Sequence, residues 1–387
     1  MSNLVPWLYG LLPAIALVAI VWYMFRRPRV QATPEDTYQR ALELWLDGEL
    51  EEATSLLRMV VHDDPHGIEP FLQLGNLLRL QGDAKRAAVL HRGLTVRPGL
   101  TRAQKITVGL ALSQDLLALQ RFAEAGEVLD TLARDAVGMS TYWKARFLQW
   151  HGLDQAPEAA RALKQGMGRC PRRDQEWFEQ AYSSYQLDRC LFLIRDGRFS
   201  EVKPRLRDVK DIGLATGRAT LVQAILAAAS EDPAAALTVA ADGLLDRPVE
   251  MSIFLPVLQD VLLQSGQYAR TIPVLERACQ AENSPASLWI DLALLYEKVG
   301  DRDKAFRLLE SKAAQGGLTP DVASPFLRLL ADESPESDFS RVWRLLSRPA
   351  QHEGWTCGDC SHHTPDIRWF CPSCHGFNTF QPGRGSR

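Results

Sequence analysis

Four cysteines near the C-terminus have the residue type and spacing of a metal site. Cys357 and Cys360 form one C-x-x-C pair, Cys371 and Cys374 form a second, and ten residues separate the two pairs. Two such pairs supply the four thiolates of a closed tetrahedral site for one zinc or iron ion. Because four protein ligands leave no coordination position for a substrate, the pattern predicts a structural ion and not a catalytic one.

The four cysteines and their neighbours also allow alternatives to a four-thiolate metal site. Gly358 and Pro372 are expected in the tight turns around the ion. A pair of disulfides is the other use of the four sulfurs, and the redox state of the compartment decides between the two. Three neighbouring histidines are alternative ligands or hydrogen-bond donors to sulfur, namely His362, His363 and His375. Four thiolates complete the site without them.

The opposite end of the chain predicts the compartment. No charged side chain occurs from Met1 to Phe25, and at about 1.5 Å per residue a helix of this length crosses a hydrocarbon layer roughly 30 Å thick. Positive charge follows this stretch at Arg26, Arg27 and Arg29, and none precedes it. The positive-inside rule therefore predicts a single-pass anchor over residues 1–30, with the remainder of the chain in the cytoplasm. A cleaved signal peptide, the alternative, carries its positive charge before the apolar segment.

Composition and motifs exclude several classes of protein. The 387 residues are 46% hydrophobic and carry a formal net charge of −3, which excludes wholesale disorder and the electrostatic footprint of a nucleic-acid-binding protein. The chain contains no phosphate-binding P-loop, H-E-x-x-H or G-x-S-x-G motif, so we expect a protein without enzymatic activity. In a reducing cytoplasm, Cys170, Cys190 and Cys279 are expected to be buried small apolar residues.

The middle of the chain is periodic. Gly48 and Gly82 lie 34 residues apart, as do Gly266 and Gly300, and 34 residues is the tetratricopeptide period. Each glycine is expected to close the turn of a helical hairpin. A small residue follows five positions later, where the two helices approach most closely, at Ala53, Ala87, Thr271 and Ala305.

These signals predict an all-α fold whose main part is a stacked tetratricopeptide array over residues 35–347. The expected hairpins cover residues 35–65, 69–98, 103–135, 140–171, 174–210, 215–248, 251–283 and 285–316, with a further helix over Pro325–Ser347. Ala160 and Ala236 are the expected packing positions of the two degenerate repeats. Stacked hairpins curve into a superhelix with a groove for peptides or proteins. An ordinary helical domain with coincidental spacing is the alternative.

A small metal module is predicted at residues 353–382. It is rich in aromatic side chains, at Trp355, Trp369, Phe370, Phe377 and Phe380. A segment this short cannot hold itself together by burial alone, so these rings are expected to form a small core that the ion supplements. The same rings are also suited to docking the module against the last helical hairpins. The two roles are compatible.

The order of these parts resembles the lipopolysaccharide assembly protein B family. The resemblance rests on W-Y-M-F-R-R at residues 22–27, L-G-N-L at 74–77 and W-F-C-P-S-C at 369–374. It implies a bacterial inner-membrane protein and a rubredoxin-like terminal module in which Cys357, Cys360, Cys371 and Cys374 are the ligands. It further implies an adaptor that restrains lipopolysaccharide synthesis by bringing the deacetylase LpxC to the FtsH protease, together with contacts to other lipopolysaccharide assembly proteins.

Three functional hypotheses follow. The first is this membrane-tethered adaptor, with the N-terminus in the periplasm. The second is a scaffold that assembles lipopolysaccharide synthesis and export proteins and takes no part in proteolysis. The third is a rubredoxin-like iron protein with a redox role, although the ten-residue gap between the cysteine pairs is much shorter than in electron-carrying rubredoxins. The repeats depart from the consensus enough that no partner-binding residue is assigned.

Overall fold

The computed structural model describes residues 33–212, 216–230, 232–246, 254–255, 257, 259, 268–280, 284–316, 327, 329 and 354–382. These residues fall into two compact units, one ending at Ala136 and one beginning at Val137, and each is described by itself. The predicted anchor, residues 1–30, and nearly all of the helix expected over Pro325–Ser347 lie outside the described residues. In the part of the chain that is described, no helix has the length and apolar character needed to cross a bilayer.

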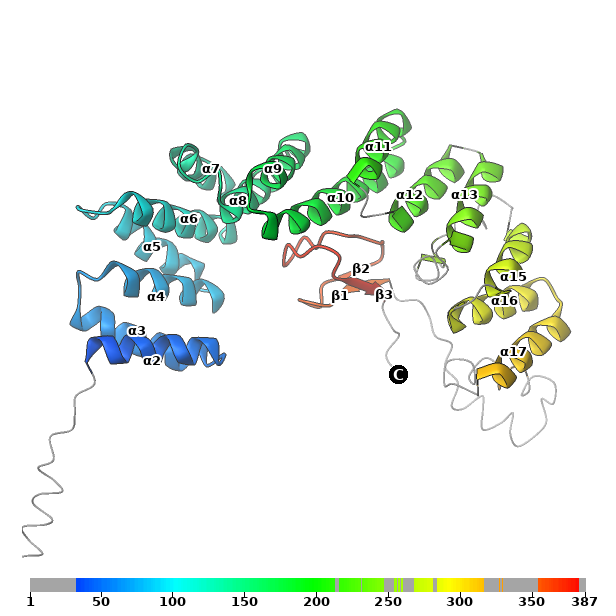
Figure 1. The fold of residues 1–387 in the computed structure, drawn as a ribbon, viewed down its shortest axis with the longest axis horizontal. Helices are drawn as coiled ribbons and strands as arrows, with labels where there is room; N and C mark the ends of the chain where they lie inside the picture. Colours follow the sequence, from blue (N-terminus) through cyan, green and yellow to red (C-terminus); the bar gives the residue numbers. More distant parts are fainter. Residues whose placement is uncertain are drawn as a thin grey trace, which may run out of the picture. The chain divides into compact units, whose positions relative to one another are not determined.

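The first unit consists of three helical hairpins (Figure 1). Its helices are α2 (Pro34–Leu46) with α3 (Leu50–Asp63), α4 (Ile68–Leu80) with α5 (Ala84–Thr95), and α6 (Arg102–Ala118) with α7 (Phe122–Leu132). Capping sequences define two of the starts. Thr33 caps α2 in a capping box with Asp36, and Thr101 caps α6 in the same way with Gln104.

The second unit continues the pattern and ends in a small sheet (Figure 1). Its helices are α8 (Ser140–Gly152), α9 (Ala156–Arg169), α10 (Arg172–Arg195), η1 (Phe199–Glu201), α11 (Val202–Ile212), α12 (Thr216–Ala229), α13 (Pro233–Asp246), η2 (Tyr268–Thr271), α15 (Ile272–Gln280), α16 (Ala286–Lys298) and α17 (Arg302–Gly316). The strands are β1 (Trp355–Cys357), β2 (His363–Thr364) and β3 (Phe380–Pro382), arranged antiparallel in the order β2-β1-β3. The predicted helical-repeat fold with a small four-cysteine module is therefore confirmed.

One turn geometry recurs in six hairpins. The residue in the turn has a positive φ, and its N–H donates to the carbonyl three positions earlier, while the next N–H reaches the carbonyl five positions before itself. The six turn residues are Gly48, Gly82, Gln120, Asp154, Gly197 and Gly300. Glycine adopts this conformation without strain, so the glycines were visible in the sequence. Gln120 and Asp154 adopt it without being glycine, so no glycine marks the turns of their hairpins in the sequence.

The residue five positions after the turn is buried in all six of these hairpins, and it is an alanine in all but the Gly197 hairpin, where it is Val202. Ala53, Ala87 and Ala305 are fully buried, as predicted, and Thr271 and Ala236 are buried as well. In the fourth hairpin the fully buried residue is Ala159, whereas the predicted Ala160 is 7% exposed. Ala160 is therefore buried as predicted, next to Ala159, which stands five positions after the turn residue Asp154.

A buried polar network ties the second and third hairpins together. The Nδ1 atom of His91 lies 2.5 Å from Asp115, and its Nε2 atom lies 3.1 Å from the carbonyl of Leu72. Arg79 pairs with the other carboxylate oxygen of Asp115 at 2.8 Å. A Cβ on Gly75 would lie 2.4 Å from the His91 ring, so the glycine of L-G-N-L makes room for the imidazole. His91 is therefore a buried structural residue of the array.

The turn geometry gives a stability prediction. Gln120→Gly removes the steric cost of a left-handed conformation and is expected to raise the free energy of unfolding by about 1 kcal/mol. Gln120→Ala keeps the Cβ and is the matched control, with little change expected. The measurement is the urea concentration at which amides of α6 and α7 lose protection from hydrogen exchange. A lower concentration for Gln120→Gly than for Gln120→Ala would contradict this account of the turn.

Candidate metal centre

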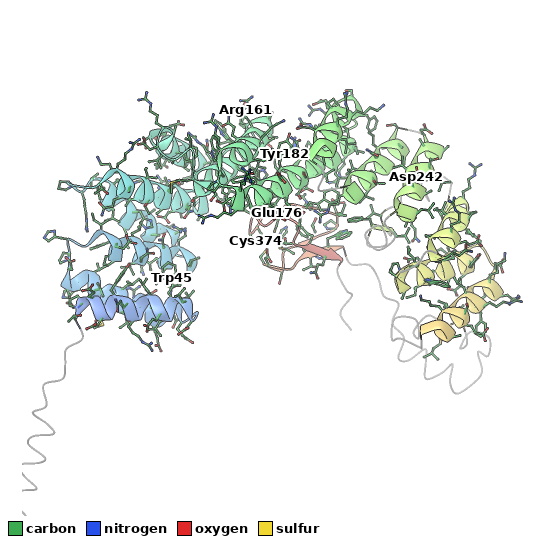
Figure 2. The ribbon with its side chains drawn as sticks, viewed as in Figure 1. Trp45, Arg161, Glu176, Tyr182, Asp242 and Cys374 are labelled. Atoms are coloured by element: carbon green, nitrogen blue, oxygen red, sulfur yellow. The ribbon has the colours of Figure 1, made fainter. Side chains whose placement is uncertain are left out.

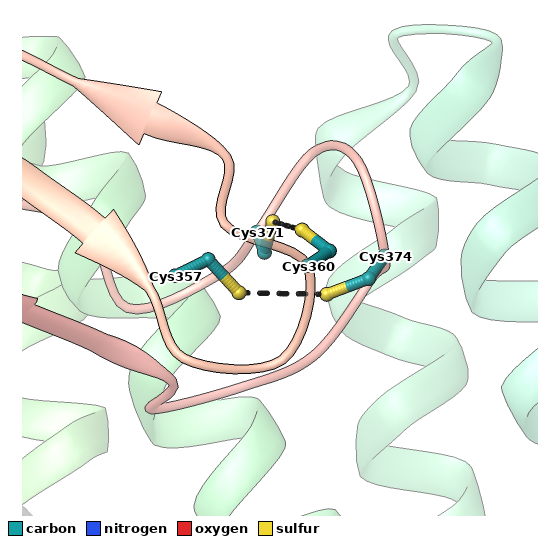
Figure 3. Close-up of side chains that lie close together, drawn as sticks. All are labelled: Cys357, Cys360, Cys371 and Cys374. Atoms are coloured by element: carbon teal, nitrogen blue, oxygen red, sulfur yellow. Dashed lines mark hydrogen bonds between the residues drawn. The ribbon is translucent and has the colours of Figure 1, made fainter.

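The four predicted cysteines converge on one point (Figure 3). All four Sγ atoms lie within 4.8 Å of one another. Each sulfur of the first pair faces one of the second, with Cys357 to Cys374 and Cys360 to Cys371 both at 3.6 Å. A tetrahedral ion with metal–sulfur bonds of about 2.3 Å requires sulfurs roughly 3.8 Å apart. The cluster is therefore able to hold one metal ion.

The disulfide alternative does not fit these distances. A disulfide bond is about 2.05 Å long, and the closest sulfurs of the cluster are 3.6 Å apart. All seven cysteines of the chain are free thiols in the structure. Cys170, Cys190 and Cys279 are buried, as expected of small apolar residues.

The two cysteine pairs share one backbone geometry. In the first, the N–H of Ser361 donates to the carbonyl of Cys357 at 2.9 Å, and in the second, the N–H of His375 donates to that of Cys371 at 2.9 Å. Ser361 and His375 both have a positive φ, 58° and 61° respectively. Gly358 and Pro372 lie in turns, as expected. The left-handed residue, however, is the one that follows each pair, and no glycine marks it in the sequence.

Electrostatics at the sulfurs favour a bound cation. Burial acts to raise the pKa of Cys357, but hydrogen bonds from Thr379 and from the backbone of Cys360 and Asp359 outweigh it and lower the pKa to about 6. Burial and the neighbouring thiols raise the pKa of Cys374 to about 12. Thiolates in mutual contact repel one another, so without a cation they cannot all ionise. A divalent ion removes that repulsion, and the donor set fits zinc or iron.

The three neighbouring histidines contact residues other than the cysteines. His362 packs edge-on against Phe380, and Nδ1 of His363 lies 3.3 Å from the hydroxyl of Thr356. The His375 ring stacks on Phe370. Within the described residues, the cluster consists of the four cysteine sulfurs alone.

A carboxylate on α10 holds the backbone next to the second cysteine pair. The N–H of Trp369 donates to one oxygen of Asp188 and the N–H of Phe370 to the other, both at 2.8 Å. Hydrogen bonds to a charged acceptor contribute about 1.5–3 kcal/mol each. Burial raises the pKa of Asp188 to about 7, and the two N–H donors with Arg368 and Arg218 act against that rise. The module is thus attached to the array two residues before Cys371. Sequence reasoning missed Asp188, because nothing in its local sequence distinguishes it from a solvent-exposed helix residue.

Aromatic packing surrounds this attachment. Figure 2 marks the module by its residue Cys374. Phe370 lies edge-on to Phe147 on α8 at 5.4 Å, and Phe377 lies 5.7 Å from Trp177 on α10. Asn378 accepts a hydrogen bond from Ser184 at 2.6 Å. Trp355, Ile367 and Trp369 belong to the same buried cluster as the helices of the second unit. The rings therefore form a small core and also dock the module, but these contacts are made with α8 and α10 and not with the last helical hairpins, where docking was expected.

Comparison with known proteins identifies the relatives of this arrangement. The chain is 23% identical over 398 residues to lipopolysaccharide assembly protein B of Escherichia coli strain K12, with 98% of both chains covered. The chain is a distant, full-span relative of lipopolysaccharide assembly protein B. The protein of that name from Haemophilus influenzae is 21% identical over 416 residues, with 97% of each chain covered. The resemblance expected from the sequence is thus confirmed.

Other comparisons add less. No family model matches the chain. A tetratricopeptide repeat protein from Parabacteroides merdae is 14% identical with a TM-score of 0.32, covering 77% of this chain and 98% of its own. The structure of Pseudomonas aeruginosa pilF is 17% identical with a TM-score of 0.38, covering 58% of this chain and 96% of its own. These scores are too low to support an argument about function.

The attachment through Asp188 is testable. Asp188→Asn leaves one acceptor oxygen and turns an amide N–H₂ towards a backbone N–H, so docking is expected to weaken by about 1–3 kcal/mol. The measurement is hydrogen exchange of a peptide covering residues 366–377, which should quicken by roughly fivefold to 150-fold.

A matched control lies in the same contact surface between the module and α10, which we call the seam. Asp366→Asn removes the salt bridge to Arg195, in which both side chains are about half exposed, so its expected effect is below about 1 kcal/mol. Equal exchange rates in the two variants would contradict the special role of Asp188.

Removing one sulfur tests the metal centre. Cys371→Ser is expected to reduce the bound metal from one equivalent to a small fraction and to unfold the terminal module, because the folding free energy of so small a module depends on the ion. Elemental analysis and limited proteolysis measure the two effects. Cys170→Ser, in the array, is the control that should retain the metal. A Cys371→Ser protein that still resists the protease would refute the prediction.

Proposed function

We propose that this protein is a non-enzymatic, inner-membrane-tethered adaptor that regulates lipopolysaccharide biosynthesis. The observation that carries the proposal is the similarity to lipopolysaccharide assembly protein B along 98% of the chain. The helical-repeat architecture supports it, because stacked hairpins present extended surfaces to other proteins. So does the four-thiol cluster, since four protein ligands around one ion leave no position for a substrate.

The mechanism we propose is presentation of a client to a protease. The client is the deacetylase LpxC and the protease is the membrane-bound FtsH, both taken from the family resemblance. An anchor over residues 1–30 confines the array to the membrane that holds the protease. Confinement raises the effective concentration of the two partners without any new contact. In this account residues 35–347 bind partners and residues 353–382 hold the metal.

The metal centre has a structural part in this mechanism. Cys357, Cys360, Cys371 and Cys374 hold one zinc or iron ion, which folds the two turns of the module. The folded turns present the Trp369 and Phe370 amides to Asp188 and the Phe370 and Phe377 rings to the helices. The ion thereby fixes the surface that the module and the second unit form together.

Client half-life tests the adaptor function directly. In a Gram-negative host that lacks its own copy, the full chain at native expression should shorten the half-life of LpxC several-fold. Removing residues 1–25 is expected to lose most of this effect, because the partners are no longer confined to one membrane. Pulse-chase of LpxC in isogenic strains provides the measurement. The matched control replaces residues 1–25 with an unrelated membrane anchor, which should restore the effect.

Other outcomes would favour the other hypotheses. An unchanged LpxC half-life together with altered lipopolysaccharide export would support the scaffold. A natively bound iron that changes its visible absorbance reversibly on reduction would support the redox protein, and tightly held zinc would eliminate it. Full activity of the untethered chain at native expression would contradict the tethering mechanism.

A further inference from the structure

A small cavity with an electropositive lining lies at the seam between the metal module and α10. Its volume is about 120 Å³. Both elements contribute to its wall, α10 through several side chains and the module through residues that precede Cys371. The polar lining residues are His151, Tyr185, Asp188, Arg189, Arg195 and Arg368.

Two acidic groups at this seam, Asp188 and Asp366, are already engaged. Both oxygens of Asp188 accept backbone N–H groups, and Asp366 pairs with Arg195 at 3.1 Å. Among the described residues, Arg189 and Arg368 make no ion pair. The Asp188 carboxylate interacts electrostatically with Arg368, but neither guanidinium group is in a salt bridge in the part of the chain that the structure describes.

Arg189 is held in place with an unsatisfied donor. Its Nε atom is buried and has no hydrogen-bond partner within the described part of the chain. Its guanidinium carbon lies 4.5 Å from the centre of the Phe192 ring, and this stacking fixes the plane of the group. A buried donor without a partner is rare in folded proteins and points to a missing acceptor.

Two neighbouring groups are consistent with an acceptor of negative charge. Burial lowers the pKa of His151, and the nearby His375, Arg189 and Arg368 lower it further, whereas Asp154 acts to raise it, so positive groups outnumber negative ones around the imidazole. Burial raises the pKa of Tyr185 to about 12, so its hydroxyl keeps a proton to donate at neutral pH.

The size of the cavity limits the ligand. A volume of about 120 Å³ equals the space of roughly four water molecules, and pockets for whole nucleotides or drug-sized molecules start near 300 Å³. Arginine forks match tetrahedral phosphate oxygens with paired hydrogen bonds. We propose that this cavity binds a phosphate group, held by Arg189 from α10 and Arg368 from the module, with the Tyr185 hydroxyl as a further donor.

Phosphate binding would then regulate how firmly the module docks against α10. A phosphate that bridges the two arginines binds only when the module is docked, so binding stabilises the docked state. The phosphate belongs either to a small phosphorylated metabolite or to the headgroup of a membrane lipid, and the chemistry of recognition is the same. This inference stands on the geometry of the seam and not on the proposed adaptor function.

The test uses the full chain in detergent micelles with its metal bound. Inorganic phosphate is added at constant ionic strength with chloride as the balance, and hydrogen exchange is followed in a peptide covering residues 366–377. At a phosphate concentration ten times the dissociation constant, exchange that requires undocking should slow about elevenfold. Absence of slowing with phosphate, and with the vesicles described below, would overturn the proposal.

Three variants separate the site from general charge effects. Arg368 is exposed, so Arg368→Gln should fold normally and weaken phosphate binding at least tenfold, and Arg189→Gln should do the same. Arg195→Gln is the matched control, because Arg195 lines the same cavity but is already paired; its affinity should stay within about twofold. Equal losses in Arg368→Gln and Arg195→Gln, or no loss in Arg368→Gln, would overturn the assignment.

Vesicles distinguish the two sources of phosphate. The chain is incorporated into phosphatidylcholine vesicles with or without phosphatidic acid, and the same peptide is followed. Slower exchange only with phosphatidic acid, abolished by Arg368→Gln, assigns a lipid headgroup. Slowing by inorganic phosphate in both kinds of vesicle, and none by phosphatidic acid, assigns a soluble phosphorylated ligand.

Discussion

The second unit depends on a pair of hydrogen bonds that the Asp188 carboxylate accepts from two consecutive backbone N–H groups. Those amides, of Trp369 and Phe370, lie immediately before Cys371. The ion-binding turns and the array therefore share one short segment of backbone. Burial of the carboxylate is costly, which is seen in its raised pKa of about 7. The two N–H donors offset this cost only when the segment has the conformation that the cysteine cluster imposes.

The helical array supplies the surface against which the module packs. Its hairpins repeat one turn geometry and one buried small residue, and this brings the helix pairs close enough to stack. Stacking places Phe147 on α8 and Trp177 on α10 against the same module, at Phe370 and Phe377 respectively. A module too small to fold by burial alone is thereby stabilised by the helices, and an ion held by the four cysteines would stabilise it further.

The parts of this structure that have a fixed local chemistry could be predicted from the sequence. The cysteine spacing identified the cluster, and turn glycines with small residues five positions later identified four of the eight expected hairpins, because both patterns depend on neighbours along the chain. The left-handed conformation of Gln120 and Asp154 was not predicted, because the hairpin imposes it and the residue type does not. The left-handed conformation of Ser361 and His375 was not predicted either, because the turn around each cysteine pair imposes it and the residue type does not. Asp188 could not be found at all, because its partners lie 181 and 182 residues away.

The central claim is that the ion and the docked seam form one cooperative unit. Protein produced in its native host is treated with a chelator under reducing conditions, and bound metal is measured alongside hydrogen exchange of the Trp369 and Phe370 amides. The account predicts that these amides lose protection in step with the metal, while amides of α2 to α7 keep theirs. Full protection of Trp369 and Phe370 after the metal has gone would contradict it.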